Sequence, residues 1–274
     1  MRPCTSRFWR DPALPFIEAR DVVDGRAISH GLHAHDTFSV GAITGGTSTY
    51  LNGTHVRRVG QGDLVLMNPG EVHACNPVDD RPWAYRMVFV DAVWLAALQG
   101  AGGLGDGMVL QPLAQQYSHD PRLFEGLDGL CELLLNATVS AQAKEAAARE
   151  WFLELMRVVG TRPLQPCVAD PLARAAAFIR DECTRPLKLE EICATVQLSP
   201  SYLIRAFKQR YSMTPHAWLM DCRLQAARAC LRQGGDIAEA AQLAGFADQA
   251  HLQRLFKRQL AATPGHYRGQ PATR

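Results

Sequence analysis

The sequence predicts an α+β protein of two domains, in which an N-terminal antiparallel β-barrel with following helices precedes an all-α domain. Three observations predict this organisation. Short strand-like runs separated by turn residues fill residues 38–90, and apolar residues take up a helical period from Asp120 onward. Roughly the last hundred residues contain one supersecondary unit twice. With 274 residues, 47% of them hydrophobic, the chain is long enough for each domain to bury its own core.

The expected strands carry distinct turn signals. In "STYLNGTHVRRV", Asn52 and Gly53 separate two strand-like runs and predict a type I′ hairpin, because both residues tolerate positive φ. "GQGDLVLMNPGEVH" reads as a turn, an apolar strand and a Pro-Gly turn that ends on His73, and "RPWAYRMVFVD" as a strand rich in aromatic and β-branched residues. Short strands without interleaved helices favour a small barrel or sandwich, which we assign to residues 1–110.

Helical periodicity follows the strands. One apolar face is formed by Leu123, Leu127, Leu130 and Leu134, and a second helix is marked by Trp151, Leu155 and Val158. We assign residues 111–162 to a helical segment, whose apolar faces are expected to be domain core. "TRPLQPCVADP" has three prolines in eleven residues and predicts a linker at 163–170, before a C-terminal domain at 171–270.

Charge is divided unevenly between the two parts. Residues 1–170 carry 14 Lys and Arg against 19 Asp and Glu, whereas residues 171–274 carry 15 against 8. A basic C-terminal part attached to an acidic N-terminal part is typical of a protein in which only one domain meets nucleic acid. The alternative is chance variation between domains.

Targeting and disulfide signals are missing from the sequence. The first thirty residues lack the apolar core of a signal peptide, and no apolar run reaches the roughly 20 residues that cross a bilayer. We therefore expect a cytoplasmic protein without a membrane partner. The 8 cysteines form no CxxC pair, and we expect reduced, mostly buried thiols.

The C-terminal repeat can be seen by aligning two segments of the sequence. "LSPSYLIRAFKQRYSMTPHAW" matches "FADQAHLQRLFKRQLAATPGHY" at an offset of 49. The matched pairs are Leu203 with Leu252, Arg205 with Arg254, Phe207 with Phe256, Lys208 with Lys257, Thr214 with Thr263, and Pro215 with Pro264. Upstream the offset becomes 48, so the second copy has one extra residue in its turn.

Each copy follows the plan of a helix-turn-helix, in which the first helix braces a second one that enters the major groove. Ser199 and Pro200 suit the start of the second helix in the first copy, and Gly245 and Asp248 suit the turn and the cap in the second. The side chains predicted to face away from the core are Ser201, Arg205 and Lys208 in the first copy and Gln249, Gln253, Arg254 and Lys257 in the second. Arg and Gln can make bidentate contacts to base edges, and Lys can bind phosphates.

A helix between the copies is expected to set their spacing. It begins at Thr214 and Pro215 and runs about 20 residues, or roughly 30 Å, close to the roughly 34 Å of one DNA turn. The alternative is an ordinary helical bundle with a solvated basic face.

Residues 171–268 resemble the DNA-binding domain of AraC-family transcriptional regulators, in "LKLEEICATVQLSPSYLIRAFKQRY", "DIAEAAQLAGFADQAHLQRLFK" and "TPGHYR". The resemblance implies seven helices in two helix-turn-helix units that act at promoters. It places base contacts at Ser201, Ile204 and Arg205 and at Gln249, Ala250, Gln253 and Arg254. Tyr202, Lys208 and Lys257 complete the expected DNA-binding set. Ile204 and Ala250 are apolar, so they could contact only thymine methyl groups.

The N-terminal half resembles the cupin-type sensor domain of such regulators, through "HAHDTFSV", "GDLVLMNPGEVH" and "WAYRMVFV". His33, His35 and His73 could bind a metal, line a ligand pocket or serve structural hydrogen bonds. Metal cupins usually add a glutamate shortly after the second histidine, and Phe38, Ser39 and Val40 stand there instead. We therefore expect a small-ligand pocket, without a metal or cofactor.

Strand alternation agrees with a pocket, because it would place His33 and His35 on one face with the small or polar Thr37, Ser39 and Gly41. Tyr50 and Arg86 are added to the ligand-binding candidates. Arg86 is the lone cation in an apolar strand and could pair either with an acidic ligand group or with an internal carboxylate.

The sequence as a whole predicts a one-component transcription factor, expected to be an activator and not an enzyme. Its expected partners are double-stranded promoter DNA and a small-molecule effector. The family resemblance also implies a second copy of the chain, bound through the dimerisation segment at 111–162, after the barrel. RNA polymerase is a further candidate partner. The alternative is a metal-dependent cupin enzyme, an oxygenase or isomerase, with an ancillary DNA-binding domain.

Overall fold

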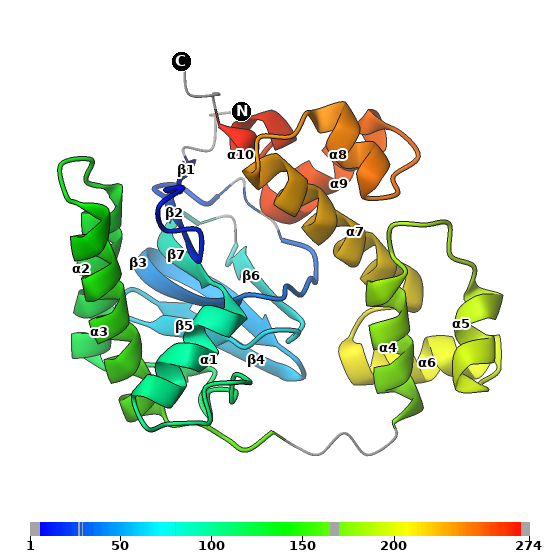
Figure 1. Ribbon diagram of the computed structural model, residues 1–274, viewed down its shortest axis with the longest axis horizontal. Coiled ribbons are helices and arrows are strands. Elements are labelled where there is room, and N and C mark those ends of the chain that lie inside the picture. Colours follow the sequence, from blue (N-terminus) through cyan, green and yellow to red (C-terminus); the bar gives the residue numbers. More distant parts are fainter. Residues whose placement is uncertain (1–5, 27, 29, 80, 165–169, 270–274) are drawn as a thin grey trace. The chain divides into compact units, whose positions relative to one another are not determined.

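The computed structural model describes residues 6–26, 28, 30–79, 81–164 and 170–269 (Figure 1). The chain divides into two compact units. The first comprises Met1–Ile28 and His35–Gln165, and the second comprises Ser29–Ala34 and Pro166–Arg274. Most of the linker expected at 163–170 lies outside the described residues. The first unit is an antiparallel sheet with helices and the second is helical, as the sequence predicted.

The sheet is built around one long strand. Its members are β1 (Ser6–Trp9), β2 (Ile17–Val22), β3 (Phe38–Asn52), β4 (His55–Gly60), β5 (Leu64–Met67), β6 (His73–Pro77), β7 (Trp83–Val90) and β8 (Tyr117–Ser118). Strand order is β1-β2-β7-β3-β5-β8, with β4 and β6 also paired to β3. The first half of β3 pairs with β5 and β7 and its second half with β4 and β6, so β3 belongs to both parts of the sheet.

A bulge lies where β3 changes partners. Its register with β7 shifts between Ile43 and Gly45, and Gly46 follows with φ of 71°. A Cβ at Gly46 would lie 2.1 Å from the carbonyl oxygen of Pro82, so only glycine fits this close approach of two strands.

The hairpin from β3 to β4 forms where expected, but the predicted type I′ turn at Asn52-Gly53 is wrong. Asn52 pairs with His55, so the loop residues are Gly53 and Thr54, and φ is positive only at Gly53, as in type II′ turns. The reason is that the Asn52 side chain is buried and donates to the hydroxyl of Tyr50 at 2.7 Å. Asn52 therefore stays in the strand.

Among the described residues of the first unit, the helix α1 (Ala92–Ala101) follows β7, and the helices α2 (Pro121–Leu135) and α3 (Ala141–Val159) follow β8. In Figure 1, α2 and α3 run side by side. The predicted leucine face of α2 is buried in one core with strand residues such as Phe38 and Val88. In α3, Trp151 and Leu155 are buried as predicted, but Val158 is exposed and Val159 takes the inward position. None of the helices in the described residues has the length and apolarity that a membrane crossing requires.

The second unit has seven helices among its described residues: α4 (Pro171–Asp181), α5 (Leu189–Val196), α6 (Pro200–Tyr211), α7 (Pro215–Arg232), α8 (Ile237–Leu243), α9 (Gln249–Leu260) and α10 (Pro264–Arg268). The repeat is confirmed in three dimensions. Helices α6 and α9 each have 12 residues and both are followed by a left-handed residue, Ser212 and Ala261. The turns before them contain positive φ at Gln197 and Gly245.

Local signals explain where these helices begin. Asp248 accepts from the backbone N–H of His251, and Thr214 from that of Ala217, so both are N-caps as predicted. Ser199 occupies the N-cap position of α6, with Pro200 in the first turn, but its side chain makes no capping hydrogen bond.

Candidate functional sites

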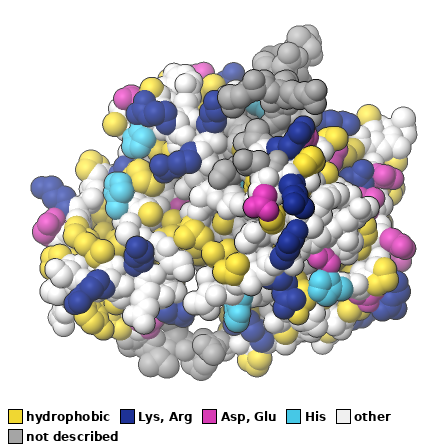
Figure 2. Space-filling model, turned by 180° about the vertical axis from the view of Figure 1, so that it is seen from behind, with side chains coloured by type: hydrophobic (Ala, Val, Ile, Leu, Met, Phe, Trp, Pro, Cys, Tyr) yellow, Lys and Arg dark blue, Asp and Glu magenta, His cyan; other side chains and the backbone are white. Residues whose placement is uncertain are grey.

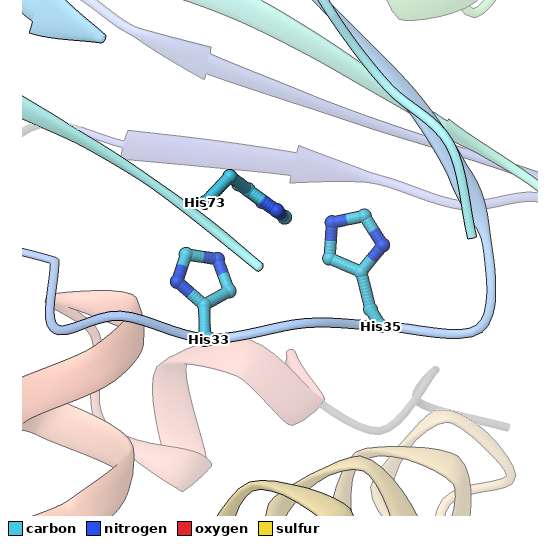
Figure 3. A group of neighbouring side chains, drawn as sticks. All are labelled: His33, His35 and His73. Carbon is cyan, nitrogen blue, oxygen red and sulfur yellow. The ribbon is translucent and has the colours of Figure 1, made fainter. Parts of the chain in front are cut away.

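The structure brings the three predicted histidines together (Figure 3). One ring nitrogen from each of His33, His35 and His73 lies within 4.8 Å of the others. The rings of His35 and His73 meet edge to face with centroids 4.8 Å apart, and both residues are buried. His73 begins β6, whereas His33 and His35 lie ahead of β3 rather than in it. Strand alternation therefore does not govern these two side chains, contrary to our expectation.

Each of the three rings is bonded through Nδ1 to the backbone two residues away. The acceptors are the carbonyl oxygens of Gly31 for His33 (2.9 Å), of Thr37 for His35 (2.8 Å) and of Glu71 for His73 (2.8 Å). Ser39, on β3, places its hydroxyl 3.2 Å from Nε2 of His35. These contacts fix the orientations of the rings.

A cavity of about 590 Å³ lies elsewhere in the first unit. It is lined by Tyr50, Asn52, His55, Val56, Arg57, Glu71, residues 113–117 and Arg162. Of the predicted ligand-binding residues, only Tyr50 lines it. Burial raises the pKa of the Tyr50 hydroxyl far above its usual range, so this group is a neutral donor, and it donates to the carbonyl of Leu66 at 2.7 Å.

The polar groups of the cavity wall are fixed by hydrogen bonds. The Glu71 carboxylate accepts from Nδ2 of Asn52 (3.2 Å), from Nδ2 of Asn68 (3.1 Å) and from Arg162 (3.0 Å). The guanidinium of Arg57 lies 3.6 Å from the ring centroid of Tyr117. Sequence reasoning missed these residues, because they come from four distant segments that share no motif.

Arg86 belongs neither to the histidine group nor to the residues that line the cavity. Its guanidinium is 2.6 Å from a carboxylate oxygen of Asp128 and 3.4 Å from one of Glu132, both on α2, and 3.6 Å from one of Asp21 on β2. Of the two alternatives that the sequence left open, this arrangement favours the internal carboxylate. Arg86 thus fastens α2 to the sheet.

The predicted DNA-binding side chains lie on the exposed faces of α6 and α9. Leu203 and Phe207 are buried in α6, and their counterparts Leu252 and Phe256 are buried in α9. The exposed residues are Ser201, Tyr202, Ile204, Arg205 and Lys208 on α6 and Gln249, Ala250, Gln253, Arg254 and Lys257 on α9. Both helices thus present the same kind of polar and basic face.

Charge on the second unit agrees with this arrangement. In Figure 2, Lys and Arg side chains are spread over the visible face of the helical unit, at the left of the view, with few acidic side chains among them. Within the described residues, neither Arg205 nor Arg254 has a carboxylate partner. Glu191 is bonded instead to Arg185, and the Glu239 side chain to the backbone of Asp236.

Comparison with known protein families matches both units. Residues 21–154 match the family described as AraC-like ligand binding domain, and residues 192–270 match a helix-turn-helix domain family.

Individual proteins give the same result. The chain is 26% identical over 224 residues to the uncharacterized HTH-type transcriptional regulator YbfI of Bacillus subtilis, covering 80% of each chain. It is 23% identical to the HTH-type transcriptional activator RhaS of Klebsiella pneumoniae, covering 85% of each chain. The crystal structure of ToxT from Vibrio cholerae O395 superposes with a TM-score of 0.57 at 10% identity, covering 98% of this chain and 98% of that one, so the fold is shared.

Proposed function

Because the chain belongs to the AraC family of transcriptional regulators, we propose that its two helix-turn-helix units read two successive major-groove segments of one promoter duplex. The observation that carries this proposal is the duplication of α6 and α9, which have the same length, the same buried pair and the same exposed polar face. An ordinary bundle needs no such repetition. Helix α7, with 18 residues, is about 27 Å long and joins the two helix-turn-helix units.

The exposed residues of α6 and α9 can be grouped by the part of the DNA that each could contact. Arg205 and Arg254 are candidates for bidentate contacts to guanine, and Gln249 and Gln253 for contacts to adenine. Ser201 can bond either to a base edge or to a phosphate, and Tyr202, Lys208 and Lys257 can bind phosphates. Ile204 and Ala250 can contact thymine methyl groups. The absence of carboxylate partners for the two arginines in the described residues supports this division.

For the effector, we propose a small polar molecule in the cavity of the first unit. Among its lining residues, Tyr50, Asn52 and Glu71 offer fixed hydrogen-bonding groups, and Arg57 offers a cation stacked on Tyr117. A volume of about 590 Å³ is in the range of small-molecule sites.

The remaining features of the proposal concern the assembly and its output. We infer a homodimer formed through α2 and α3, which activates transcription in the cytoplasm through contact with RNA polymerase. The similarity to an activator supports activation. The relatives are transcriptional regulators, so the proposal assigns no enzymatic activity, and none of them supports the cupin enzyme alternative.

Footprinting tests the proposal. The purified full chain is added to the DNA upstream of its own gene, and cleavage protection is measured with and without competitor DNA. We expect protected segments in which two contacted regions lie about one helical turn, roughly 34 Å, apart on one face of the duplex. Uniform, sequence-independent coating of the DNA would contradict sequence-specific regulation.

A further inference from the structure

Helix α7 is shared by two groups of helices in the second unit (Figure 1). It packs against α4 and α6 of the first group and against α8, α9 and α10 of the second. The first group contains the helix-turn-helix α5–α6, and the second group contains the helix-turn-helix α8–α9. The angle between the two groups therefore decides how α6 and α9 are placed relative to each other.

Arg223, in the middle of α7, is bonded to the first group. Its Nε donates to the carbonyl oxygen of Cys183 at 2.7 Å, and its Nη2 donates to that of Arg185 at 2.9 Å. Both carbonyls belong to the turn between α4 and α5, residues 182–188. The Arg185 side chain in turn donates to a carboxylate oxygen of Glu191, on α5, at 2.8 Å. The planar guanidinium of Arg223 thus holds α7 and the start of the first helix-turn-helix in one geometry.

The second helix-turn-helix meets the same turn at Gly245. This glycine lies between α8 and α9 and has φ of 78°. A Cβ at this position would lie 2.5 Å from the carbonyl oxygen of Thr184 and 3.2 Å from Nε of Arg223. Thr184 stands between Cys183 and Arg185, whose carbonyls accept from Arg223. The α4–α5 turn, Arg223 and the α8–α9 turn therefore meet at one point, which we call the junction.

The half-buried guanidinium of Arg223 is held at the junction by neutral groups. Within the described residues it has no carboxylate partner, and burial lowers the pKa of the guanidinium. Its two hydrogen bonds to carbonyl oxygens are charge-assisted, and such bonds are about twice as strong as neutral ones. Loss of this side chain would remove the bonded link between α7 and the α4–α5 turn.

We propose that Arg223 sets the relative orientation of the two helix-turn-helix units and so restricts the DNA spacing that the chain accepts. It is a positioning residue, because it acts through the junction and not through a contact with DNA. The proposal rests on the proposed function, since it requires two units that read one duplex. One base pair added between two sites moves them apart by about 3.4 Å and rotates one of them by about 35°, so two units in a fixed orientation accept one spacing.

Orientation is measured first, on the full chain without DNA. Nitroxide labels are attached to unnatural amino acids at Gln209 and Arg258, which are exposed and equivalent in the two repeats, and electron double resonance gives the distribution of distances between the labels. We expect a narrow distribution for the wild-type chain and one about twofold broader for Arg223→Ala, because the units can then reorient. Arg223→Lys keeps the charge without the planar fork and should give an intermediate width. The matched control is Arg232→Ala, an exposed arginine of the same helix, which should leave the width unchanged.

Spacing is then measured by gel-shift titration on the footprinted operator and on variants with one base pair added or removed between the two contacted regions. The wild-type chain and Arg232→Ala should bind these variants about tenfold more weakly, because one unit loses its base contacts. Arg223→Ala should bind the original operator more weakly but should differ by about threefold or less across the spacings, because its units adapt to each. Its preference for bases within each region should be retained.

The outcomes separate this proposal from the proposed function. An unchanged distance distribution in Arg223→Ala, or equal weakening of its binding at every spacing, would overturn the role of Arg223 and leave the proposed function intact. A wild-type chain that binds all spacings equally, or none, contradicts the proposed function and with it the restriction on spacing. If circular dichroism shows that Arg223→Ala does not fold, Arg223→Lys decides, and wild-type behaviour of that variant in both assays would overturn the proposal.

Discussion

Glu71 links the histidine cluster to the cavity, because its backbone carbonyl accepts from Nδ1 of His73 at 2.8 Å while its carboxylate lies in the cavity wall. That carboxylate also accepts from the side chains of Asn52, Asn68 and Arg162. An effector that contacts Glu71 therefore acts on a residue that positions one of the histidines.

Replacing Glu71 with Ala should destabilise the first unit by about 1–3 kcal/mol, because the buried amides of Asn52 and Asn68 each lose one of their acceptors. Glu125→Ala on exposed α2 surface removes the same charge and should change stability by less than about 0.5 kcal/mol. Urea unfolding followed by tryptophan fluorescence measures the difference, since Trp9, Trp83, Trp94 and Trp151 report on this unit. Equal effects of the two substitutions would remove Glu71 from its structural role.

The pairing of Arg86 with Asp128 should appear as a coupling free energy. The two side chains are 19% and 33% exposed and 2.6 Å apart, so a double-mutant cycle of the two alanine variants should give about 1 kcal/mol in urea unfolding. The value should fall in high salt. The contrary result is zero coupling, with Arg86→Ala losing effector binding at unchanged stability. Arg86 would then be a ligand-binding residue rather than the partner of an internal carboxylate.

DNA binding should weaken steeply as salt rises. Lys208, Lys257 and neighbouring arginines displace counterions from phosphates, so the logarithm of affinity falls linearly with the logarithm of salt concentration. Titrations between roughly 50 and 200 mM salt measure the slope, and Lys208→Ala should reduce it by about one. An affinity that does not change across this range would exclude phosphate contacts as a major source of binding.

A fragment that begins near Asp170 should fold and bind DNA by itself. Helices α4 to α10 bury their own core, with Leu203, Leu224 and Phe256 among the buried residues. Its affinity should be lower than that of the full chain, because it lacks the second protomer's contacts. Circular dichroism and gel-shift titration test both points. An unfolded fragment would place the domain boundary elsewhere.

The helical unit was predictable because its signals are local. Caps such as Asp248, positive-φ turn positions such as Gly245 and the buried pair Leu203 and Phe207 all lie within a few residues of the structure they specify. The second copy, at an offset of 49 residues, carries the same kinds of local signal and so supports the same prediction again.

Strands β1 and β2 were missed because charged residues interrupt their pattern. Glu18 and Arg20 in β2 are 4% and 5% exposed, although charges normally mark an outward face. The structure stabilises them through Arg10, 2.8 Å from Glu18, and through the ring of Phe8, 5.0 Å from the guanidinium of Arg20. Contacts of this kind form only in the folded chain. The same is true of the cavity, whose lining includes residues from distant segments, among them Tyr50, Glu71, Tyr117 and Arg162. No local sequence pattern predicts the burial of these charges or the lining of the cavity.

The central claim is that both repeats read DNA bases, and binding of Arg205→Ala and Arg254→Ala to a panel of single-base operator variants tests it most directly. Thermal stability is measured in parallel, and Arg232→Ala on exposed α7 surface serves as the control for charge alone. Each reading variant should lose about 1–3 kcal/mol on the cognate site and relax preference at one location only. The two locations should lie about one helical turn apart, with melting temperatures unchanged. Uniform loss of affinity for all operators, accompanied by destabilisation, would contradict the claim and assign these arginines to the support of the fold.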